Sequence, residues 1–335
     1  MTTIAVDAMG GDYAPEEIVH GAVAAVKEFG VKVQLTGPEG ILVRELEKYD
    51  VSNLPIEIIQ ANDVIDMGET QPAIAVRKKP NSSIAVAMNQ VSAGFAGGVV
   101  AAGSTGAAAA AALLCIKRLE GIERPCIAAV MPTHSKPVIL ADAGANVEST
   151  PEQLFQNAIM GVALSKGLFK LTSPRVALLN IGEEPGKGNS LVKETYELLK
   201  NNQDINFIGN VEGRDVPDGA CDVCVCDGFV GNVFLKTAEG MAKMIAGLLR
   251  EELTRDAKSK LGALLAKDAF YRMKKRIDYA EYGGAQLLGV KGVCVIAHGS
   301  SKYIAIKNAI RVAKEAVEAN IMTLIESMVK THVKK

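Results

Sequence analysis

Short apolar runs alternate with amphipathic segments along almost the whole chain. Runs rich in aliphatic and β-branched residues predict strands at residues 3–7, 31–35, 55–60, 98–102, 125–131, 137–141, 175–181, 205–208, 222–226 and 292–297. Helical periodicity predicts helices over residues 15–29, 41–48, 107–117, 151–166, 191–201, 232–252 and 301–330. Because strands that alternate with helices form parallel sheets covered on both faces, the pattern predicts an α/β fold with a mostly parallel sheet. No repeat, low-complexity tail or long linker interrupts it, so we expect one α/β domain over residues 1–335.

One stretch, about residues 233–285, breaks this alternation because its pattern is nearly all helical. We expect it to form a helical insert that protrudes from the sheet. Its middle part combines apolar side chains with basic ones, namely Leu261, Leu264 and Leu265 with Lys258, Lys260 and Arg272. Such an amphipathic surface with a basic excess favours contact with an anionic partner, either a membrane or an acidic protein. The alternative is a helix that packs on its own core.

Composition narrows the class of protein. The net charge is −1, so no global basic field favours nucleic acid as a partner. The six cysteines lie mostly in apolar runs and no signal peptide is recognised, which predicts a reducing cytosol. Cys221, Cys224 and Cys226 lack a second pair of ligands at a zinc-like spacing, so no metal is expected.

Residues 80–116 carry no charge, but their alanine and glycine content predicts a strand, a turn and a helix rather than a membrane span.

Five loops that directly follow predicted strands combine glycine with hydrogen-bonding side chains. They hold Gly10 and Gly11; Ser104 and Thr105; Gly186, Lys187 and Gly188; Asn232; and His298 and Ser300. Because the carboxyl ends of parallel strands share one edge, we expect these loops to gather where open α/β sheets bind ligands. Glycine lets the backbone approach a ligand closely, and free backbone N–H groups favour an anion. The alternatives are a solvated lysine on a polar turn for Lys187 and a capping role for His298.

The absence of several known motifs reduces the number of ligand classes to consider. The chain has no G-x-G-x-x-G after a strand, no GxxxxGK[ST] loop and no G-x-S-x-G elbow. A dinucleotide, a nucleoside triphosphate and a serine hydrolase mechanism are therefore not indicated. The remaining inventory of backbone N–H groups, hydroxyls, amides and one lysine is typical of a site for phosphate or acyl-phosphate without a metal.

Seven ordered segments carry a resemblance to a known family. They are AVDAMGGDYAP, AGSTGA, ADAGAN, NIGEEPGKGN, CDGFVGN, EYGGAQLLGV and HGSS, spread from residue 5 to residue 301. Together they resemble the bacterial phosphate acyltransferases of phospholipid synthesis. The resemblance implies a three-layer α/β/α Rossmann-like fold. It also implies transfer of a long-chain fatty acyl group from acyl carrier protein to inorganic phosphate, which gives acyl-phosphate.

The same resemblance implies partners and a location. It implies a homodimer without a cofactor, in the cytoplasm, held loosely at the inner face of the cell membrane through the helical insert. A downstream membrane glycerol-3-phosphate acyltransferase would consume the product. Acyl carrier protein is acidic, so the basic surface of the insert could bind it, the membrane, or both.

Phosphate is a nucleophile and a thiolate is a good leaving group, so no covalent enzyme nucleophile is required. The enzyme must position the anion and stabilise the oxyanion. We assign Lys187, Asn232 and His298 as catalytic residues and the hydroxyls and glycines of the five loops as phosphate ligands. Asp7, Asp12 and Asp227 are expected to order loops and cap helices. Two other hypotheses are a metal- and NAD-dependent decarboxylating dehydrogenase and a membrane-attached scaffold whose phosphate site is only structural.

Overall fold

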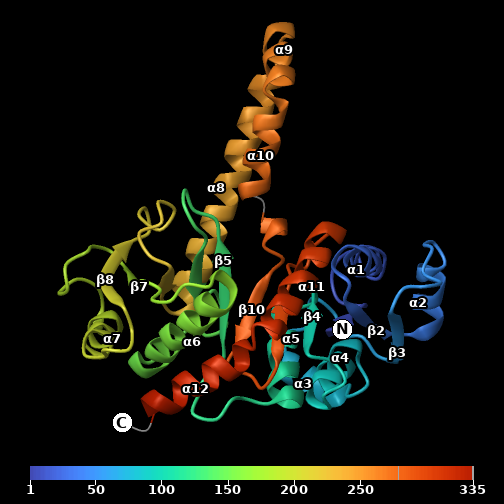
Figure 1. Ribbon diagram of the computed structural model, residues 1–335, viewed down its shortest axis with the longest axis horizontal. Helices are drawn as coiled ribbons and strands as arrows, with labels where there is room; N and C mark the ends of the chain where they lie inside the picture. The colour runs from blue at the N-terminus through green and yellow to red at the C-terminus, as the bar shows by residue number, and fades with distance from the viewer. Residues whose placement is uncertain (278, 334–335) are drawn as a thin grey trace.

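The computed structural model describes residues 1–277 and 279–333, and within them one sheet of eleven strands carries helices on both faces (Figure 1). The strands are β1 (Thr3–Asp7), β2 (Lys32–Gly37), β3 (Ile56–Gln60), β4 (Gly98–Ala101), β5 (Cys126–Met131), β6 (Val138–Ala141), β7 (Val176–Asn180), β8 (Phe207–Glu212), β9 (Val223–Val225), β10 (Ala285–Leu288) and β11 (Val293–Ile296). The main helices are α1 (Glu16–Phe29), α2 (Glu39–Leu46), α3 (Pro72–Lys78), α4 (Ser83–Ser92), α5 (Thr105–Ala111), α6 (Pro151–Phe169), α7 (Ser190–Lys200), α8 (Gly228–Thr254), α9 (Ala257–Leu265), α10 (Lys267–Ile277), α11 (Tyr303–Glu318) and α12 (Ile321–Val333). A π-helical turn η1 (Ala112–Ile116) extends α5, and a 3₁₀ turn η2 (Tyr279–Glu281) precedes β10.

The predicted fold class is confirmed, with corrections at several elements. Each of the ten predicted strands overlaps an observed one, and seven of the ten strand pairs are parallel. The sequence pattern missed α3, α4 and the antiparallel strand β10. The helix predicted over residues 301–330 is two helices, because the backbone at Asn320 turns to φ 52°.

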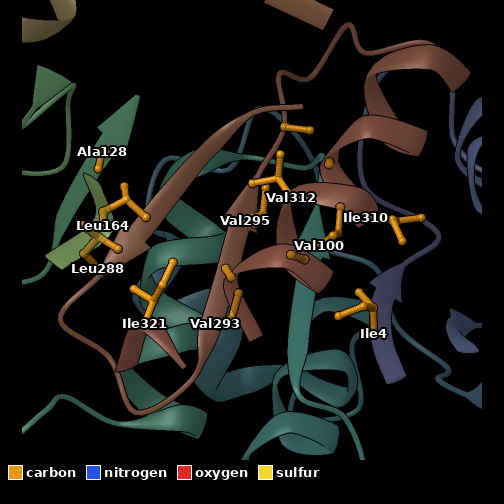
Figure 2. Close-up of a cluster of buried hydrophobic side chains, with 14 of the residues drawn as sticks. Ile4, Val100, Ala128, Leu164, Leu288, Val293, Val295, Ile310, Val312 and Ile321 are labelled. Atoms are coloured by element: carbon orange, nitrogen blue, oxygen red, sulfur yellow. The ribbon is translucent and has the colours of Figure 1, made fainter. Parts of the chain in front are cut away.

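Two hydrophobic layers sandwich the sheet. One face packs against α1, α2, α6, α7, α11 and α12. Figure 2 shows part of this layer, in which Val100 and Val295 of neighbouring strands lie near Ile310 and Val312 of α11. The opposite face packs against α3, α4, α5 and the first turns of α8. Small residues such as Ala107, Ala108 and Ala111 let α5 pack directly on the strands.

The sheet consists of two parallel halves that run in opposite directions. Its strand order is β3-β2-β1-β4-β11-β10-β5-β6-β9-β7-β8, and β10 is antiparallel to β11 and β5, while β5 is antiparallel to β6. One row of paired residues crosses the middle of the sheet: Val100, Val295, Gln286, Ala128, Ala141 and Val225. That row lies at or beside the carboxyl ends of β4, β11, β6 and β9. The carboxyl ends of the two halves therefore approach the middle strands from opposite sides.

This topology corrects the prediction that all five glycine loops share one edge of the sheet. The loops after β1, β4 and β11 belong to one edge, and those after β7 and β9 belong to the other. The sequence predicts both β5 and β6, but the alternation of strands and helices does not reveal that these two strands pair antiparallel and so reverse the sheet.

The predicted insert is a helical hairpin. Helix α8 leaves the sheet, α9 forms the far end, and α10 returns beside α8 (Figure 1). At the far end Leu261, Leu264 and Leu265 are 60%, 67% and 83% exposed, so they do not pack on the core of the protein. In the described parts of the chain, no helix has both the length and the apolar character that crossing a bilayer requires.

Candidate active site

A cavity of about 530 Å³ lies over the middle strands, on the sheet face that carries α5 and the start of α8. Its floor is apolar and consists of Ile127 and Ala129 of β5, Ala285 of β10 and Ile296 of β11. These positions are next to the row where the two half-sheets meet. The cavity therefore occupies the place where the carboxyl ends of both halves converge.

The first rim of the cavity comes from the loops after β4 and β11. Ser104 and Thr105 line it, and Ser104 caps α5 by accepting a hydrogen bond from the N–H of Ala107 at 3.5 Å. Behind this rim lies the turn after β1. At Gly11, φ is +111°, and a Cβ there would lie 3.1 Å from the carbonyl oxygen of Ala102. Gly11 thus lets the first loop pack directly against the strand end that carries Ser104.

His298 follows β11 and also lines the cavity. Its Nδ1 lies 2.8 Å from Ser300 Oγ and accepts a hydrogen bond from the backbone N–H of Ser300 at 3.2 Å. Because a backbone N–H can only donate, Nδ1 is the unprotonated nitrogen of the neutral ring, and Nε2 carries the proton. Partial burial, assisted by Lys236, lowers the pKa of His298 below its usual 6.5. The imidazole is therefore neutral at pH 7 and offers an N–H donor.

The second rim is built on Asp142, which follows β6 and is fully buried. Its carboxylate accepts hydrogen bonds from the backbone N–H groups of Ile127, Gly144, Ala145 and Asn146 at 2.8–3.0 Å. These bonds fold residues 143–146 into a tight loop. Sequence reasoning noted the segment ADAGAN but gave Asp142 no role.

The start of α8 rests on this loop. Asp227 caps the helix by accepting from the N–H of Val230 at 2.9 Å. A Cβ on Gly228 would lie 2.5 Å from the carbonyl oxygen of Asn146, so only glycine allows this approach. The side chain of Asn232 then lies over Gly144, with Cγ 3.3 Å from where a Cβ of that glycine would be. Asn232 thereby faces the cavity from the second rim.

One face of α8 continues the cavity wall beyond Asn232. Leu235, Lys236 and Glu239 follow at the spacing of one helix face and line the cavity. Lys236 Nζ lies 2.9 Å from Glu239 Oε2. Sequence analysis did not select this ion pair, although the i, i+3, i+4, i+7 spacing from Asn232 was present in the sequence and could have indicated it.

The loop with Lys187 lies elsewhere. It follows β7, which is separated from β6 by β9, and neither Lys187 nor its flanking glycines line the cavity. The loop is held by hydrogen bonds from Asn180 Nδ2 to the Lys187 carbonyl at 3.2 Å and from Asn210 Nδ2 to the Glu184 carbonyl at 3.0 Å. A Cβ on Gly186 would meet nothing within 4 Å. Lys187 is exposed, and the catalytic role assigned to it stays a prediction.

The structure thus brings most of the predicted residues together and leaves one group apart. Ser104, Thr105, Asn232, His298 and Ser300 line one cavity, and Gly10 and Gly11 form the turn behind its first rim. Gly186, Lys187 and Gly188 do not line it, so the expectation that Lys187 lies in the same cavity as Asn232 and His298 is not met.

Two buried thiols lie beneath the second rim. Cys226 Sγ donates to the Asp142 carbonyl at 3.6 Å. Burial raises the pKa of Cys226 and of Cys126 well above 9, so both remain protonated near neutral pH and are poor nucleophiles. Within residues 1–277 and 279–333, no three metal-binding side chains form a cluster. The cavity therefore offers hydroxyl, amide, imidazole and ammonium donors above an apolar floor.

Comparison with solved structures identifies the fold. A phosphotransacetylase from Streptococcus pyogenes has a TM-score of 0.64 at 18% identity, over 95% of this chain and 94% of that one. A branched-chain phosphotransacylase from Enterococcus faecalis has a TM-score of 0.59 at 18% identity, over 95% and 99%. The chain thus has the fold of the phosphotransacetylases.

Sequence relatives define the class further. Residues 2–324 match the family model described as "Fatty acid synthesis protein". A phosphate acyltransferase of Trichodesmium erythraeum is 49% identical over 97% of this chain and 96% of that protein. One from Gloeobacter violaceus is 51% identical over 96% and 95%. The protein is therefore an acyltransferase. It belongs to the fatty acid synthesis protein family, together with these phosphate acyltransferases.

Proposed function

We propose that this enzyme transfers a long-chain fatty acyl group from acyl-[acyl carrier protein] to inorganic phosphate. The product is acyl-phosphate, which a membrane glycerol-3-phosphate acyltransferase would use for phospholipid synthesis. One observation carries the proposal: a single cavity joins anion-binding donors on two rims to an apolar floor. A substrate with a charged head beside a fatty acyl chain requires this combination. Membership of the family supports it.

The proposed reaction is direct displacement. An oxygen of hydrogen phosphate attacks the thioester carbonyl carbon, the carbon–sulfur bond breaks, and the thiolate of the carrier takes the phosphate proton. Ser104 and Thr105 bind the phosphate oxygens with their hydroxyls. The Ser300 hydroxyl joins them by turning away from His298 Nδ1, which keeps the hydrogen bond from the Ser300 backbone N–H. The Nε2–H of His298 and the amide of Asn232 donate to the carbonyl oxygen as it becomes negative. Such preorganised donors act mainly by positioning and by stabilising the developing charge.

The neutral state of His298 agrees with this role. Because burial lowers the pKa of His298, the proton on Nε2 persists without a positive charge as the pH rises above 7. A donor of this kind stabilises an oxyanion and does not need to transfer its proton. Lys187 would contribute to binding of the phosphate only if its loop reached the cavity.

The helical hairpin supports a proposed attachment to partners. Its far end exposes Leu261, Leu264 and Leu265 beside the basic residues Lys258 and Lys260, and Arg272 is exposed on α10. Apolar residues flanked by basic ones bind the surface of anionic membranes, and basic helices bind acidic proteins. We propose that the hairpin holds the enzyme at the inner face of the cell membrane and contributes to binding of acyl carrier protein. A homodimer remains part of the same proposal.

Release of free thiol tests the reaction. Purified protein is mixed with acyl-carrier thioester, with and without inorganic phosphate, and free carrier thiol is measured. The proposal expects phosphate-dependent release together with a hydroxylamine-reactive acyl-phosphate. Equal release without phosphate would indicate a thioesterase, and no release would favour the scaffold hypothesis. Dehydrogenase activity would instead need added NAD and a metal, which the same assay can include.

A further inference from the structure

The charges that line the cavity are few and unevenly distributed. Lys236 is the only lysine or arginine among the lining residues that the structure describes. Asp12 and Glu239 are the acids, and His298 is neutral at pH 7. A phosphate dianion entering this cavity therefore meets one permanent cation. Without it, the neutral donors would face the two negative charges alone.

Lys236 already has an anionic partner within the cavity. Its ammonium lies 2.9 Å from the carboxylate of Glu239, one turn further along α8. The Glu239 side chain is only 22% exposed, whereas that of Lys236 is 49% exposed. The pair holds the ammonium on the same helix face as Asn232, which lies one turn earlier. Lys236 is thus kept next to a residue proposed to stabilise the oxyanion.

We infer that Lys236 is the cation that binds the phosphate, and that Glu239 is an internal carboxylate which phosphate displaces from it. This inference rests on the proposed function. In the free enzyme, Glu239 neutralises Lys236 and prevents it from binding weaker anions. A phosphate dianion held also by Ser104, Thr105 and Ser300 outcompetes a single carboxylate, because it accepts several charge-assisted and neutral hydrogen bonds at once.

Lys236 is not the lysine that the sequence alone indicated, which was Lys187. Lys187 lies on the loop after β7, outside the cavity, whereas Lys236 is in its wall. The two assignments can be distinguished by the Michaelis constant for phosphate. If Lys236 binds phosphate, its substitution raises this constant; if Lys187 does, substitution of Lys187 raises it.

The experiment compares steady-state kinetics of five variants with the unmodified enzyme. Lys236→Met is expected to raise KM for phosphate by about tenfold or more, the lower range for losing one charge-assisted hydrogen bond. It should leave KM for the acyl carrier protein within about twofold. Glu239→Gln removes the competing carboxylate and is expected to lower KM for phosphate about threefold, following the usual range for one exposed ion pair. Lys236→Arg keeps the charge and should restore much of the affinity.

The matched control is Lys48→Met. Lys48 and Glu45 form an ion pair of the same spacing, at 2.8 Å, with 54% and 11% exposure, and neither residue lines the cavity. This variant should behave like the unmodified enzyme. The competing variant is Lys187→Ala. If that variant raises KM for phosphate and Lys236→Met does not, the inference is wrong and the loop after β7 binds the phosphate.

Direct binding separates this inference from the proposed reaction. Calorimetric titration with inorganic phosphate alone measures affinity in unmodified protein and in the Lys236 and Glu239 variants. The same order of affinities is expected, strongest for Glu239→Gln and weakest for Lys236→Met. If unmodified protein releases no thiol but shows this order, the proposed reaction fails and the phosphate site stands. Equal affinities in all variants overturn the role of Lys236, whatever the turnover.

Discussion

Gly231 of α8 lies directly against the carbonyl oxygen of Asp142. A Cβ on Gly231 would overlap that oxygen and would also lie 2.9 Å from Cys226 Sγ. The first turn of α8 therefore packs backbone to backbone on the loop that follows β6. Through this contact the helix that carries Asn232 and Lys236 is fixed to the middle of the sheet.

Gly231→Ala should destabilise the protein and disturb the site. The methyl group has no space, so either the helix or the loop must move, at a cost of about 1–3 kcal/mol, as for other overpacked positions. Urea unfolding measures the loss, and the thiol-release assay measures the effect on turnover. The matched control is Gly240→Ala in the same helix, where a Cβ meets nothing within 4 Å. That substitution should stabilise by about 0.5–1 kcal/mol. Similar behaviour of the two variants would contradict the contact.

Asp142→Asn should be more damaging than an ordinary surface substitution. The carboxylate accepts four backbone N–H groups as well as the side-chain amide of Asn146 at 2.9 Å. An amide in its place presents N–H groups to some of these donors and leaves buried groups unpaired, at a cost of about 2–4 kcal/mol. Thermal or urea unfolding tests this. Asp256→Asn, at the exposed cap of α9, is the control and should change stability by less than about 0.5 kcal/mol, since asparagine caps helices well.

The order of elements could be predicted from the sequence, but their directions could not. Strand β1 is predicted with its observed bounds, because a glycine-containing loop and a helix start follow a clear apolar run. Strand β10 has only four residues and lies between the helical insert and β11, so its periodicity carries no signal. Strand β10 pairs antiparallel with both β11 and β5, so those two strands run in the same direction. The reversal arises where β5 pairs antiparallel with β6, and this pairing decides which loops meet.

Those site residues that lie in local sequence patterns could be predicted, whereas their grouping in space could not. Ser104, Asn232 and His298 were recognisable from glycine-rich loops after strands, and local patterns of this kind survive the reversal of the sheet. Lys187 fitted the same local pattern but follows β7, which lies beyond β9. Lys236 lies inside a helix. Its spacing from Asn232 could be seen in the sequence, but the structure was needed to show that this face of the helix lines the cavity.

The carboxyl group of Asp7 should make stability depend on pH in an unusual direction. It is buried beneath the turn after β1, where Oδ1 accepts from the N–H of Met9 at 3.3 Å. Burial is the main reason that the pKa of Asp7 rises from 3.8 to about 6. Between these values the folded state keeps the proton that the unfolded state releases. This group therefore stabilises the fold below about pH 4, and its contribution is lost as the pH rises through about 6.

Asp7→Asn isolates this effect. The shift corresponds to a change on the order of 3 kcal/mol in the free energy of unfolding. The difference between variant and unmodified protein should therefore move in favour of the variant as the pH rises from about 4 to about 7. Urea unfolding at several pH values measures the difference, in which other titrating groups cancel. Asp50→Asn should show the opposite trend, and mainly as the pH falls below about 4, because hydrogen bonds from Ser52 lower the pKa of that exposed carboxylate beneath its usual 3.8. A difference that does not vary with pH would show that Asp7 is ionised throughout.

Introducing negative charge at the far end of the hairpin tests the proposed membrane attachment. Leu264 and Leu265 are 67% and 83% exposed, so replacing both with glutamate should leave the fold intact. The change removes apolar area and adds two charges that an anionic surface repels. We expect flotation with vesicles of anionic phospholipid to fall at least about tenfold, while thiol release from soluble acyl-carrier thioester continues.

The control replaces Leu198 and Ile208, which are 39% and 43% exposed and lie outside the hairpin, with glutamate. Because this control adds the same charge elsewhere, it should keep vesicle binding. Equal loss in both double variants would attribute binding to net charge alone, and persistent binding of the Leu264 and Leu265 variant would exclude the hairpin end as the membrane contact.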